Sequence, residues 1–480
     1  MSELTTVRLL PPTRPGLQAE RQDPHRFALT VLLAGTVLIV VDFFIVNVAL
    51  PSIQSDLHAS TAALEWVVAG YGLTLAVFLV TAGRVGDRFG RRRIFRTGVA
   101  VFTATSGVCG LAPDSTVLVV ARLAQGVGAA MISPTVLALI GVLYTGVARA
   151  RAIGIYATVM GVAAASGQLV GGGLLQLDIA GLGWRLVFLV NVPVGVLTLA
   201  AARRWIPESR AERPARIDVL GLVLLTLGLT ALVLPLVEGR SAGWPAWAVS
   251  GLAAAPVLLA AFLRRQRNQA RKGQAPLLDP ALFTCRTFTA GLVVQFGFWT
   301  GQASYFLVLA LYLQLGRGLS PLASGLMFTI MAGSYLFASL AASALVRRYG
   351  GRAIIAGGAL GLAVGHTLAL VAADHIGVRG SVLALAPGLA IAGIGMGMCL
   401  GPITATVLAS ADSEQAGALA GALSTVQQVG NALGVALIGL VFFAGARTGY
   451  VPAFEDSLGA LAVLLLGVAA CARLLPGSPR

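Results

Sequence analysis

The strongest chemical signal in the sequence comes from two ionisable side chains, Asp42 and Arg122, that lie within long apolar segments. A charge in the hydrocarbon interior of a membrane costs at least ~2.5–3.5 kcal/mol, so such residues are functional by default. Burial favours the neutral form of an acid, whereas a neighbouring cation favours the carboxylate. An acid held between these two effects gains and loses a proton as its access to water changes. Asp42 is therefore the candidate proton-coupling residue, and Arg122 is the cation that tunes it and is released when it is protonated. A static salt bridge between two helices is the alternative.

The segments that must position these two residues are predicted to be membrane helices. The chain has 480 residues and is 57% hydrophobic and 11% charged, whereas ordinary soluble domains have roughly 25% charged residues. A span needs ~20 apolar residues, and it must be helical because backbone polar groups in lipid have to be satisfied within the segment. Fourteen segments qualify: 27–49, 63–82, 95–112, 116–143, 150–174, 184–203, 219–237, 246–263, 288–314, 322–345, 353–373, 379–406, 416–444 and 457–475.

The distribution of positive charge predicts the orientation of these spans. The densest cluster, GRVGDRFGRRR at Gly83–Arg93, lies between two apolar spans and is expected to be a loop at the cytoplasmic surface. With both termini inside, 28 of the 34 Lys and Arg residues fall in cytoplasmic segments and 5 in outside loops. The net charge of +15 then reflects topology and does not indicate a nucleic-acid partner. Residues 1–26 and 476–480 are expected to be cytoplasmic tails, the first of them disordered.

A weak internal repeat divides the chain into two related halves. RFGRRRIFRTG at 88–98 resembles RYGGRAIIAGG at 348–358, with a constant offset. The repeat predicts an N-terminal six-helix bundle over 27–203 and a C-terminal one over 288–475. The segment 204–287 is then a linker that carries two inserted spans. Two related halves around a site near the membrane midplane are the arrangement that alternating-access transporters use.

Five motifs in the expected order resemble those of the major facilitator superfamily, and in particular its fourteen-span drug:proton antiporter branch. The motifs are GRVGDRFGRR (83–92), VDFFIVNVALPSI (41–53), ARLAQGVGAA (121–130), WRLVFLVNVPVG (184–195), and IDVLG (217–221) with EGRSAGW (238–244). The resemblance implies an all-α major facilitator fold with two six-helix bundles and two inserted helices. It also implies a monomer in the bacterial cytoplasmic membrane, driven by the proton gradient without a cofactor. Because the first and fourth spans line the cavity together in this superfamily, Asp42 and Arg122 are expected to pair.

The span 5 motif departs from the pattern of the branch. In SGQLVGGG (166–173), Gln168 stands where the branch has a proline. Some relatives also have an acid in span 13, where TVQQVGNALG (425–434) has none. The motif glycines that remain in span 5 are Gly161, Gly167, Gly171 and Gly172.

The resemblance gives the Gly83–Arg93 segment a second role as a conformational gate. It implies that Asp87 locks the cytoplasmic face closed by pairing with an arginine and by facing the positive N-terminal end of a helix from the other half. A solvated charge that serves only topology is the alternative. At the same offset, Arg347, immediately before the repeat at 348–358, stands in place of the acid. The residues assigned to the gate are Gly83, Gly86, Asp87, Arg88, Gly90 and Arg91.

Amide and aromatic side chains in the spans are predicted to line the substrate cavity, because such a lining suits lipophilic ligands that make a few hydrogen bonds. Each of them is equally suited to hold two helices together. With one buried acid, neutral or monocationic drugs are favoured over dications. His366 is expected to form a hydrogen bond with a neighbouring helix. The predicted cavity residues are Asn47, Tyr71, Gln125, Gln295, Trp299, Gln302, Tyr305, Gln427, Gln428 and Asn431.

These observations predict proton-driven export of lipophilic drugs or antibiotics, and two alternatives remain. A transporter of an endogenous polar metabolite would have several charged residues facing the cavity. A membrane enzyme acting on lipids would need clustered acids or histidines in a loop. The sequence has neither signature, nor a GxxxxGK[ST] motif for ATP, nor the cysteine spacing of a metal site or disulfide framework.

Overall fold

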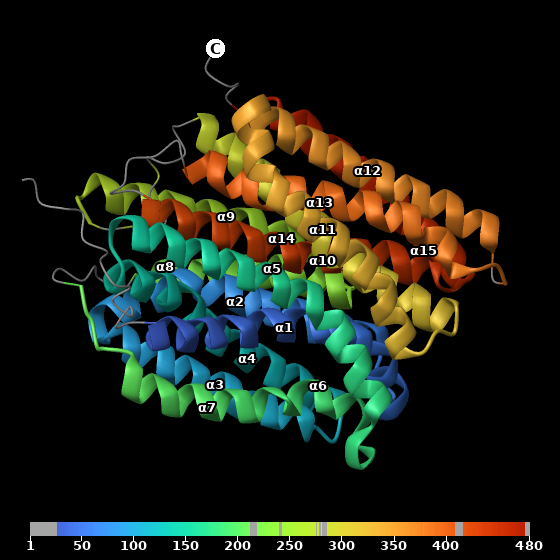
Figure 1. Ribbon diagram of the computed structural model, residues 1–480, viewed down its shortest axis with the longest axis horizontal. Helices are drawn as coiled ribbons and strands as arrows, with labels where there is room; N and C mark the ends of the chain where they lie inside the picture. The colour runs from blue at the N-terminus through green and yellow to red at the C-terminus, as the bar shows by residue number, and fades with distance from the viewer. Residues whose placement is uncertain are drawn as a thin grey trace, which may run out of the picture.

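The computed structural model is helical throughout the residues that it describes, which are 26–211, 218–239, 242–274, 276–277, 280, 286–377, 379–408 and 416–475. None of these residues is in a strand. Figure 1 shows the helices packed as a bundle of long, roughly aligned rods. The predicted tails lie outside the described residues, except for Arg26. The α-helices are α1 (Arg26–Leu57), α2 (Thr61–Phe89), α3 (Arg91–Gly110), α4 (Ser115–Leu143), α5 (Gly146–Leu177), α6 (Leu186–Leu189), α7 (Asn191–Trp205), α8 (Val219–Glu238), α9 (Ala246–Arg271), α10 (Arg286–Leu311), α11 (Pro321–Tyr349), α12 (Gly351–Ile376), α13 (Ala386–Leu408), α14 (Ala416–Gly445) and α15 (Tyr450–Ala472).

Every predicted span overlaps one of these helices, but fewer than fourteen pass as membrane spans by length and apolarity. In the described part of the chain, 12 helices pass, or 13 if the two parts of α5, bent by 41° between Ala164 and Ser166, count as one span. The helix α3 is not among them, because it begins with three arginines and continues with several threonine and serine residues. The fourteen-span count therefore stays a prediction.

The helices form two groups that follow the order of the chain. In the first group, α4 packs against α2 and α3, and α5 packs against α1. In the second, α13 packs against α11 and α12, while α14 and α15 pack against α10. Figure 1 shows the blue-to-green helices on one side of the bundle and the yellow-to-red helices on the other.

The two groups share a helix connection that reflects the internal repeat. The segment Gly83–Arg93, predicted to be a loop, is instead almost wholly helical, because α2 runs to Phe89 and α3 begins at Arg91. Only Gly90 separates them, with φ of 115°, and Gly350 separates α11 from α12 with φ of 82°. Both values lie in the region that favours glycine. A single glycine can therefore make the sharp corner between two helices, and a loop of several residues is not needed.

The inserted helices α8 and α9 form a pair beside the two groups. The helix α8 contacts both α2 and α14, and α9 packs on α8. Asp218 caps α8 through the backbone N–H of Gly221 (2.9 Å) and binds Arg265 of α9 (2.7 Å). Burial alone would raise the pKa of the Asp218 carboxyl, but Arg265, Gly221 and Gln266 together hold that pKa below its usual value of 3.8.

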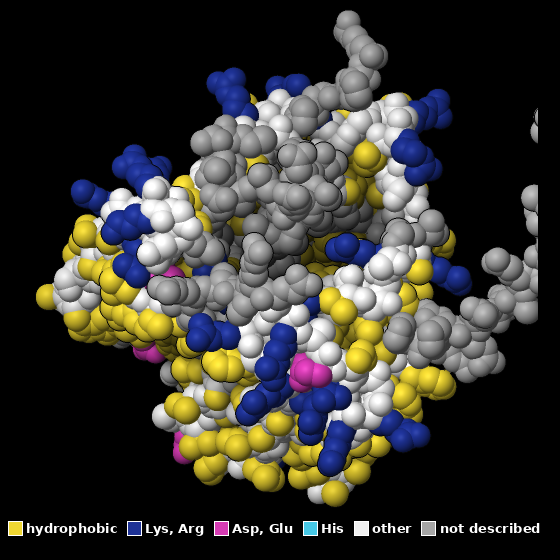
Figure 2. Space-filling view, turned by 90° about the vertical axis from the view of Figure 1, so that its left-hand side faces the viewer, with side chains coloured by type: hydrophobic (Ala, Val, Ile, Leu, Met, Phe, Trp, Pro, Cys, Tyr) yellow, Lys and Arg dark blue, Asp and Glu magenta, His cyan; other side chains and the backbone are white. Residues whose placement is uncertain are grey.

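The two ends of the bundle differ in how the groups meet. We call the end at Gly90 the basic end and the end at His58–Ser60 the far end. Several contacts between the groups lie towards the far end, where the Gln314 side chain donates to the backbone oxygen of Val48 (2.9 Å) and Pro321 lies against Gly172. Figure 2 shows Lys and Arg side chains around a central hollow on the basic end. The bundle is thus closed towards the far end and hollowed at the basic end.

Candidate functional site: a buried ion pair in the N-terminal half

The side chains of Asp42 and Arg122 form an ion pair inside the N-terminal half, and both are 0% exposed. Besides Arg122, two amides donate to the Asp42 carboxylate: Gln125 Nε2 at 2.9 Å and Asn191 Nδ2 at 2.8 Å, both to Oδ1. The carboxylate is thus held by donors from α4 and α7 while it stands on α1. Its charge is compensated on both oxygens.

The Arg122 guanidinium is held by groups other than the carboxylate as well. Its Nε donates to the backbone oxygen of Val67 (2.8 Å), and its Nη1 donates to Gln125 Oε1 (2.6 Å). Its Cζ lies 4.3 Å from the centre of the Tyr71 ring and 5.7 Å from that of Phe188, within the range of cation–π attraction. Arg122 therefore keeps several partners when the charge on Asp42 is removed.

The position of Arg122 follows from helix periodicity and from close packing of α2 against α4. Arg122 and Gln125 are three residues apart, so their side chains lie on the same face of α4. One turn on, a Cβ built at Gly126 would lie 2.5 Å from the backbone oxygen of Tyr71. A larger residue there would push the helices apart and move the guanidinium away from Val67.

Two members of this network, Ser106 and Asn191, were not among the residues selected from the sequence. The Ser106 hydroxyl accepts from Gln125 Nε2 at 2.7 Å and from Asn191 Nδ2 at 3.5 Å, and Ser106 is 0% exposed. Both are polar residues inside apolar segments, and Asn191 lies within a motif already noted for its resemblance. That combination is the signal that could have identified them.

A second charged cluster lies at the basic end, where the gate was predicted. Asp87 pairs with Arg91 one turn on (2.7 Å), and the Asp87 backbone oxygen accepts from the N–H of Ala211 (3.0 Å). The Glu208 carboxylate accepts from the backbone N–H groups of Arg92 (3.0 Å) and Arg93 (3.2 Å). Glu208, which the sequence did not single out, thus caps α3.

The remaining gate residues lie around this cluster, near the junction of α2 and α3. A Cβ at Gly86 would lie 3.1 Å from Thr135, so this glycine lets α2 approach α4 closely, whereas a Cβ at Gly83 would lie at an ordinary contact distance of 3.5 Å from Pro134. Arg88 is exposed, and its guanidinium lies over the Phe89 ring (5.7 Å). The ion pair of Asp87 is formed within the N-terminal half, and its role as a latch against the other half stays a prediction.

The ten predicted cavity residues lie on α1, α2, α4, α10 and α14, and their place in a substrate cavity stays a prediction. Tyr71 and Gln125 belong to the network around Arg122. Asn47 donates back to its own helix at Phe44 (3.2 Å), and Asn431 donates to Gln428 (2.8 Å) within α14. The others are distributed as follows: Gln295, Gln302 and Tyr305 are buried in α10, while Trp299 of α10 and Gln427 of α14 are half-buried.

The surroundings of His366 differ from the predicted hydrogen bond to a neighbouring helix. Neither ring nitrogen has a hydrogen-bond partner among the residues that the structure describes. Instead the ring stacks on Tyr305, with ring centres 4.3 Å apart. It is fully buried, so this aromatic contact takes the place of the expected hydrogen bond.

Comparison with known proteins identifies the family. A family model described as Major Facilitator Superfamily matches residues 32–435. The chain belongs to the Major Facilitator Superfamily. It is therefore a multi-pass membrane transporter and not an enzyme, which removes the lipid-enzyme alternative.

Curated relatives within the Major Facilitator Superfamily carry names of export proteins. The chain is 37% identical over 441 residues to the "Probable actinorhodin transporter" of Streptomyces coelicolor, covering 91% of this chain and 76% of the relative. It is 34% identical to the "Multidrug resistance protein Stp" of Mycobacterium tuberculosis (90% and 79% covered). It is 32% identical to the "Multidrug efflux pump LfrA" of Mycolicibacterium smegmatis (96% and 91% covered).

Solved structures of the superfamily share the fold of this chain. A POT family transporter in complex with 5-aminolevulinic acid matches with a TM-score of 0.70 and 13% identity, covering 92% of this chain and 94% of its own. The xylose transporter XylE from E. coli, in a partially occluded inward-open conformation, matches with a TM-score of 0.64 and 16% identity, covering 94% and 98%. At these identities the likeness shows the fold alone.

The four glycines singled out in the predicted span 5 pack α5 against α1 and α11. A Cβ at Gly167 would lie 2.9 Å from Phe44, and one at Gly171 would lie 2.7 Å from Ile45, both on α1. On the other side, a Cβ at Gly161 would lie 3.1 Å from the hydroxyl of Tyr335 on α11, and Gly172 meets Pro321 as described above. The helix thus touches both halves of the transporter closely.

Glu65 is a second fully buried carboxylate, in addition to Asp42. It is 0% exposed, and a Cβ at Gly439 of α14 would lie 3.0 Å from its carboxyl carbon. Glu65 lies near one end of the predicted span 63–82. Its burial comes from the contact between α2 and α14, which the sequence of α2 alone does not reveal.

Proposed function

We propose that the protein is a proton-coupled antiporter that exports lipophilic neutral or monocationic drugs or antibiotics by alternating access. The names of the curated relatives, which describe a transporter, a resistance protein and an efflux pump, support export of such compounds. The one observation that supports coupling to protons is the buried Asp42–Arg122 pair with its amide donors. We further propose a monomer in the bacterial cytoplasmic membrane, with the basic end and both termini in the cytoplasm and with no cofactor.

Asp42 is the coupling site in this proposal, because its protonation changes the interactions of its own helix, α1, with α4 and α7. Protonation removes the charge that attracts Arg122 and gives the carboxyl a hydrogen to donate. Arg122 then relies on the Val67 oxygen, on Gln125 and on the Tyr71 ring, all of which remain in place. The attachment of α1 to α4 weakens, whereas α4 stays attached to α2.

Coupling follows if water reaches Asp42 from one side at a time. The bundle is closed towards the far end, so in this state a proton would be exchanged through the hollow at the basic end. Movement of the two halves about the centre would close that hollow and open the far end. Asp87 and Arg91 lie where the halves would meet in the second state, and we propose that Asp87 then pairs across the halves as a latch.

A toxicity panel tests the proposed function. The chain is expressed in an efflux-deficient bacterium, with the wild type beside Asp42→Asn, and minimal inhibitory concentrations are measured for neutral, monocationic and dicationic lipophilic compounds. We expect the wild type to raise the tolerated concentration of neutral and monocationic compounds and Asp42→Asn to abolish that gain. If the wild type protects against none of them, transport of an endogenous metabolite becomes the better account.

A further inference from the structure

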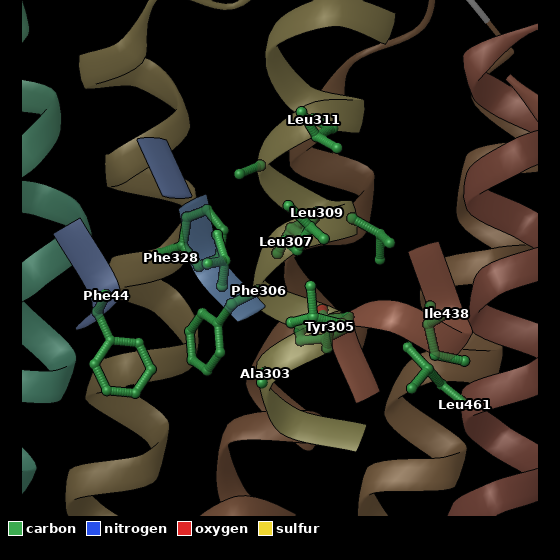
Figure 3. Close-up of a cluster of buried hydrophobic side chains, with 14 of the residues drawn as sticks. Phe44, Ala303, Tyr305, Phe306, Leu307, Leu309, Leu311, Phe328, Ile438 and Leu461 are labelled. Atoms are coloured by element: carbon green, nitrogen blue, oxygen red, sulfur yellow. The ribbon is translucent and has the colours of Figure 1, made fainter. Parts of the chain in front are cut away.

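The contact between the two halves is closely filled by side chains, whereas a wide groove lies on the outside of the bundle. Phe306 stacks on Phe328 with ring centres 5.6 Å apart and meets Phe44 edge-on at 5.0 Å, and Figure 3 shows these rings next to one another. The cavity beside them holds about 20 Å³, which is room for about one water molecule. The groove, in contrast, lies along the last turns of α9 and holds about 410 Å³.

Three arginines and an asparagine line this groove, which we call the α9 groove. The described residues of its lining are Ala260, Leu263, Arg264, Arg267, Asn268 and Arg271. Their spacing of three and four residues places them on one face of α9. The three arginines are exposed, and among the described residues no carboxylate pairs with any of them. The groove thus presents three positive charges that no described acid neutralises.

Membrane topology does not account for the placement of these arginines on one face. The positive-inside rule depends on how many Lys and Arg residues flank a span, not on which face of the helix carries them. In RRQRNQAR (264–271), Arg265 is turned to α8 instead, where it binds Asp218 (2.7 Å). One arginine of this run therefore serves an ion pair between helices, and the other three gather on the outer face.

The inner face of α9 holds the arginine-bearing turns in place. Phe262 and Gln266 are buried there, at 2% and 1% exposed. Gln266 Nε2 donates to Asp218 Oδ2 (3.1 Å), and Gln266 Oε1 accepts from the backbone N–H of Leu277 (2.6 Å). The α9 groove is thus built on a helix that is fixed along its opposite side.

Towards the far end, the same face of α9 is apolar and exposed. Val249 and Val257 are 57% and 67% exposed, and Ala253 and Ala260 between and beyond them are exposed as well. Because α9 packs chiefly on α8, this face meets lipid in a membrane. A molecule with a negative headgroup and hydrocarbon chains matches both parts of the face.

We propose that the α9 groove binds the headgroup of an anionic phospholipid from the leaflet at the basic end. Arg264, Arg267 and Arg271 donate to the phosphate oxygens, and the acyl chains lie along Val257 and Val249. A guanidinium offers paired N–H groups that match a phosphate, and basic pockets at the membrane surface bind such headgroups. The bound lipid holds the inserted pair α8 and α9 at that leaflet, a role that goes beyond export.

The charge of the groove also ranks the lipids. One phosphodiester has one negative charge, whereas the groove has three positive ones, so a lipid with two phosphodiesters binds more tightly than a lipid with one. The C-terminal end of a helix carries partial negative charge, which by itself repels an anion. The affinity therefore comes from the arginine side chains and is lost with them.

Native mass spectrometry of the purified full chain in detergent tests the proposal. Dissociation constants of the first bound lipid are measured for phosphatidylcholine, phosphatidylglycerol and cardiolipin with matched acyl chains. These headgroups have no net charge, one negative charge and two, and the wild type should bind them with affinity that increases in this order.

A triple variant, Arg264→Gln with Arg267→Gln and Arg271→Gln, should lose the preference for anionic lipids. A basic residue near an anionic membrane surface is worth about fivefold in affinity, and salt screens exposed charges. The triple variant is therefore expected to bind cardiolipin roughly tenfold more weakly, or weaker still, and phosphatidylcholine within about twofold of the wild type. Arg267→Gln alone should weaken cardiolipin binding severalfold, which keeps the test available if the triple variant does not fold.

A matched variant removes the same number of charges elsewhere at the basic end. Arg203, Arg204 and Arg473 are exposed and do not line the α9 groove, so their joint replacement by Gln should leave cardiolipin affinity within about twofold. Inorganic phosphate at the concentration of the lipid should leave the lipid bound, because it has no acyl chains. Cardiolipin should raise the thermal unfolding temperature of the wild type more than that of the groove variant.

Equal cardiolipin affinity in the wild type and the triple variant would overturn the proposal, and so would an equal loss in the matched variant. Displacement of the lipid by an equal concentration of inorganic phosphate would point to a soluble anion instead. A wild type that binds phosphatidylcholine as tightly as cardiolipin would likewise overturn the proposal. Lipid binding is measured on purified protein, so its failure leaves the export function and the Asp42→Asn panel unaffected.

Discussion

Neutralising Asp42 and Arg122 separately and together distinguishes a proton-coupling pair from a static salt bridge. In Asp42→Asn, the Arg122 guanidinium stays fully buried without its counter-charge. Removing one partner of a buried ion pair costs about 3–5 kcal/mol. Since the Asn side chain keeps an oxygen that can accept from Gln125 or Asn191, most of that cost comes from the uncompensated charge. Arg122→Gln should cost less, because the carboxylate can become neutral by taking up a proton.

The double variant removes both charges and should recover most of the lost stability. Replacing a buried ion pair by neutral residues is often neutral or stabilising by about 1–4 kcal/mol. We therefore expect the double variant, Asp42→Asn with Arg122→Gln, to have an unfolding midpoint at a denaturant concentration equal to or above that of the wild type. The midpoint of Asp42→Asn alone should lie well below it. Unfolding is followed in detergent by tryptophan fluorescence during titration with a denaturing detergent.

Transport measured on the same variants decides between the two roles. If Asp42 carries the coupled proton, export driven by a proton gradient is lost in both single variants and stays lost in the double variant, although its stability returns. If the pair only holds α1 to α4, export returns together with stability. A double variant that is as stable as the wild type and exports drugs as fast would therefore refute the coupling role.

Three further predictions concern packing, the basic end and the inserted helices. Gly126→Ala should destabilise the protein by about 1–3 kcal/mol in thermal unfolding, because the added methyl would meet the backbone oxygen of Tyr71; wild-type stability would contradict the tight contact. Asp87→Ala should fold and insert but export slowly in vesicles, whereas normal export would favour a purely topological charge. Asp218→Asn should lower stability at neutral pH, because the depressed carboxyl pKa stabilises the fold above its usual value of 3.8. That contribution should vanish as the pH falls below this value, and a pH-independent difference between the two proteins would contradict the ion pair with Arg265.

The helical architecture and the ion pair were accessible from the sequence for clear physical reasons. Long apolar segments in lipid have to be helices, and Asp42 and Arg122 stood out as the charges inside two of them. The resemblance to the superfamily, whose first and fourth spans line the cavity together, predicted that they pair, and the structure places them in contact. The sequence could not assign Ser106 or Asn191 to the same site, because that assignment requires knowing which faces of α3 and α7 are turned towards α1 and α4.

Other features were hidden because they depend on contacts between the halves or on a single backbone angle. The charged segment at Gly83–Arg93 was expected to be a loop, but one residue with positive φ, Gly90, replaces it. Gln168 stood out in the sequence only because it occupies the position where the branch has a proline. That its amide is buried and has no hydrogen-bond partner among the described residues became visible once α5 was set against α11. The predicted cavity residues were chosen by type, and residue type does not say which side of a helix faces the other half.

Drug-driven proton movement through purified protein in liposomes tests whether Asp42 couples drug export to proton uptake. A pH-sensitive dye is enclosed in vesicles with no initial pH difference, and an inward or outward gradient of an exported compound is imposed. We predict that the wild type moves protons opposite to the drug and that Asp42→Asn moves none, although the unfolding assay above shows that the variant is folded. Drug-driven proton movement in Asp42→Asn at the wild-type rate would contradict the coupling role of Asp42.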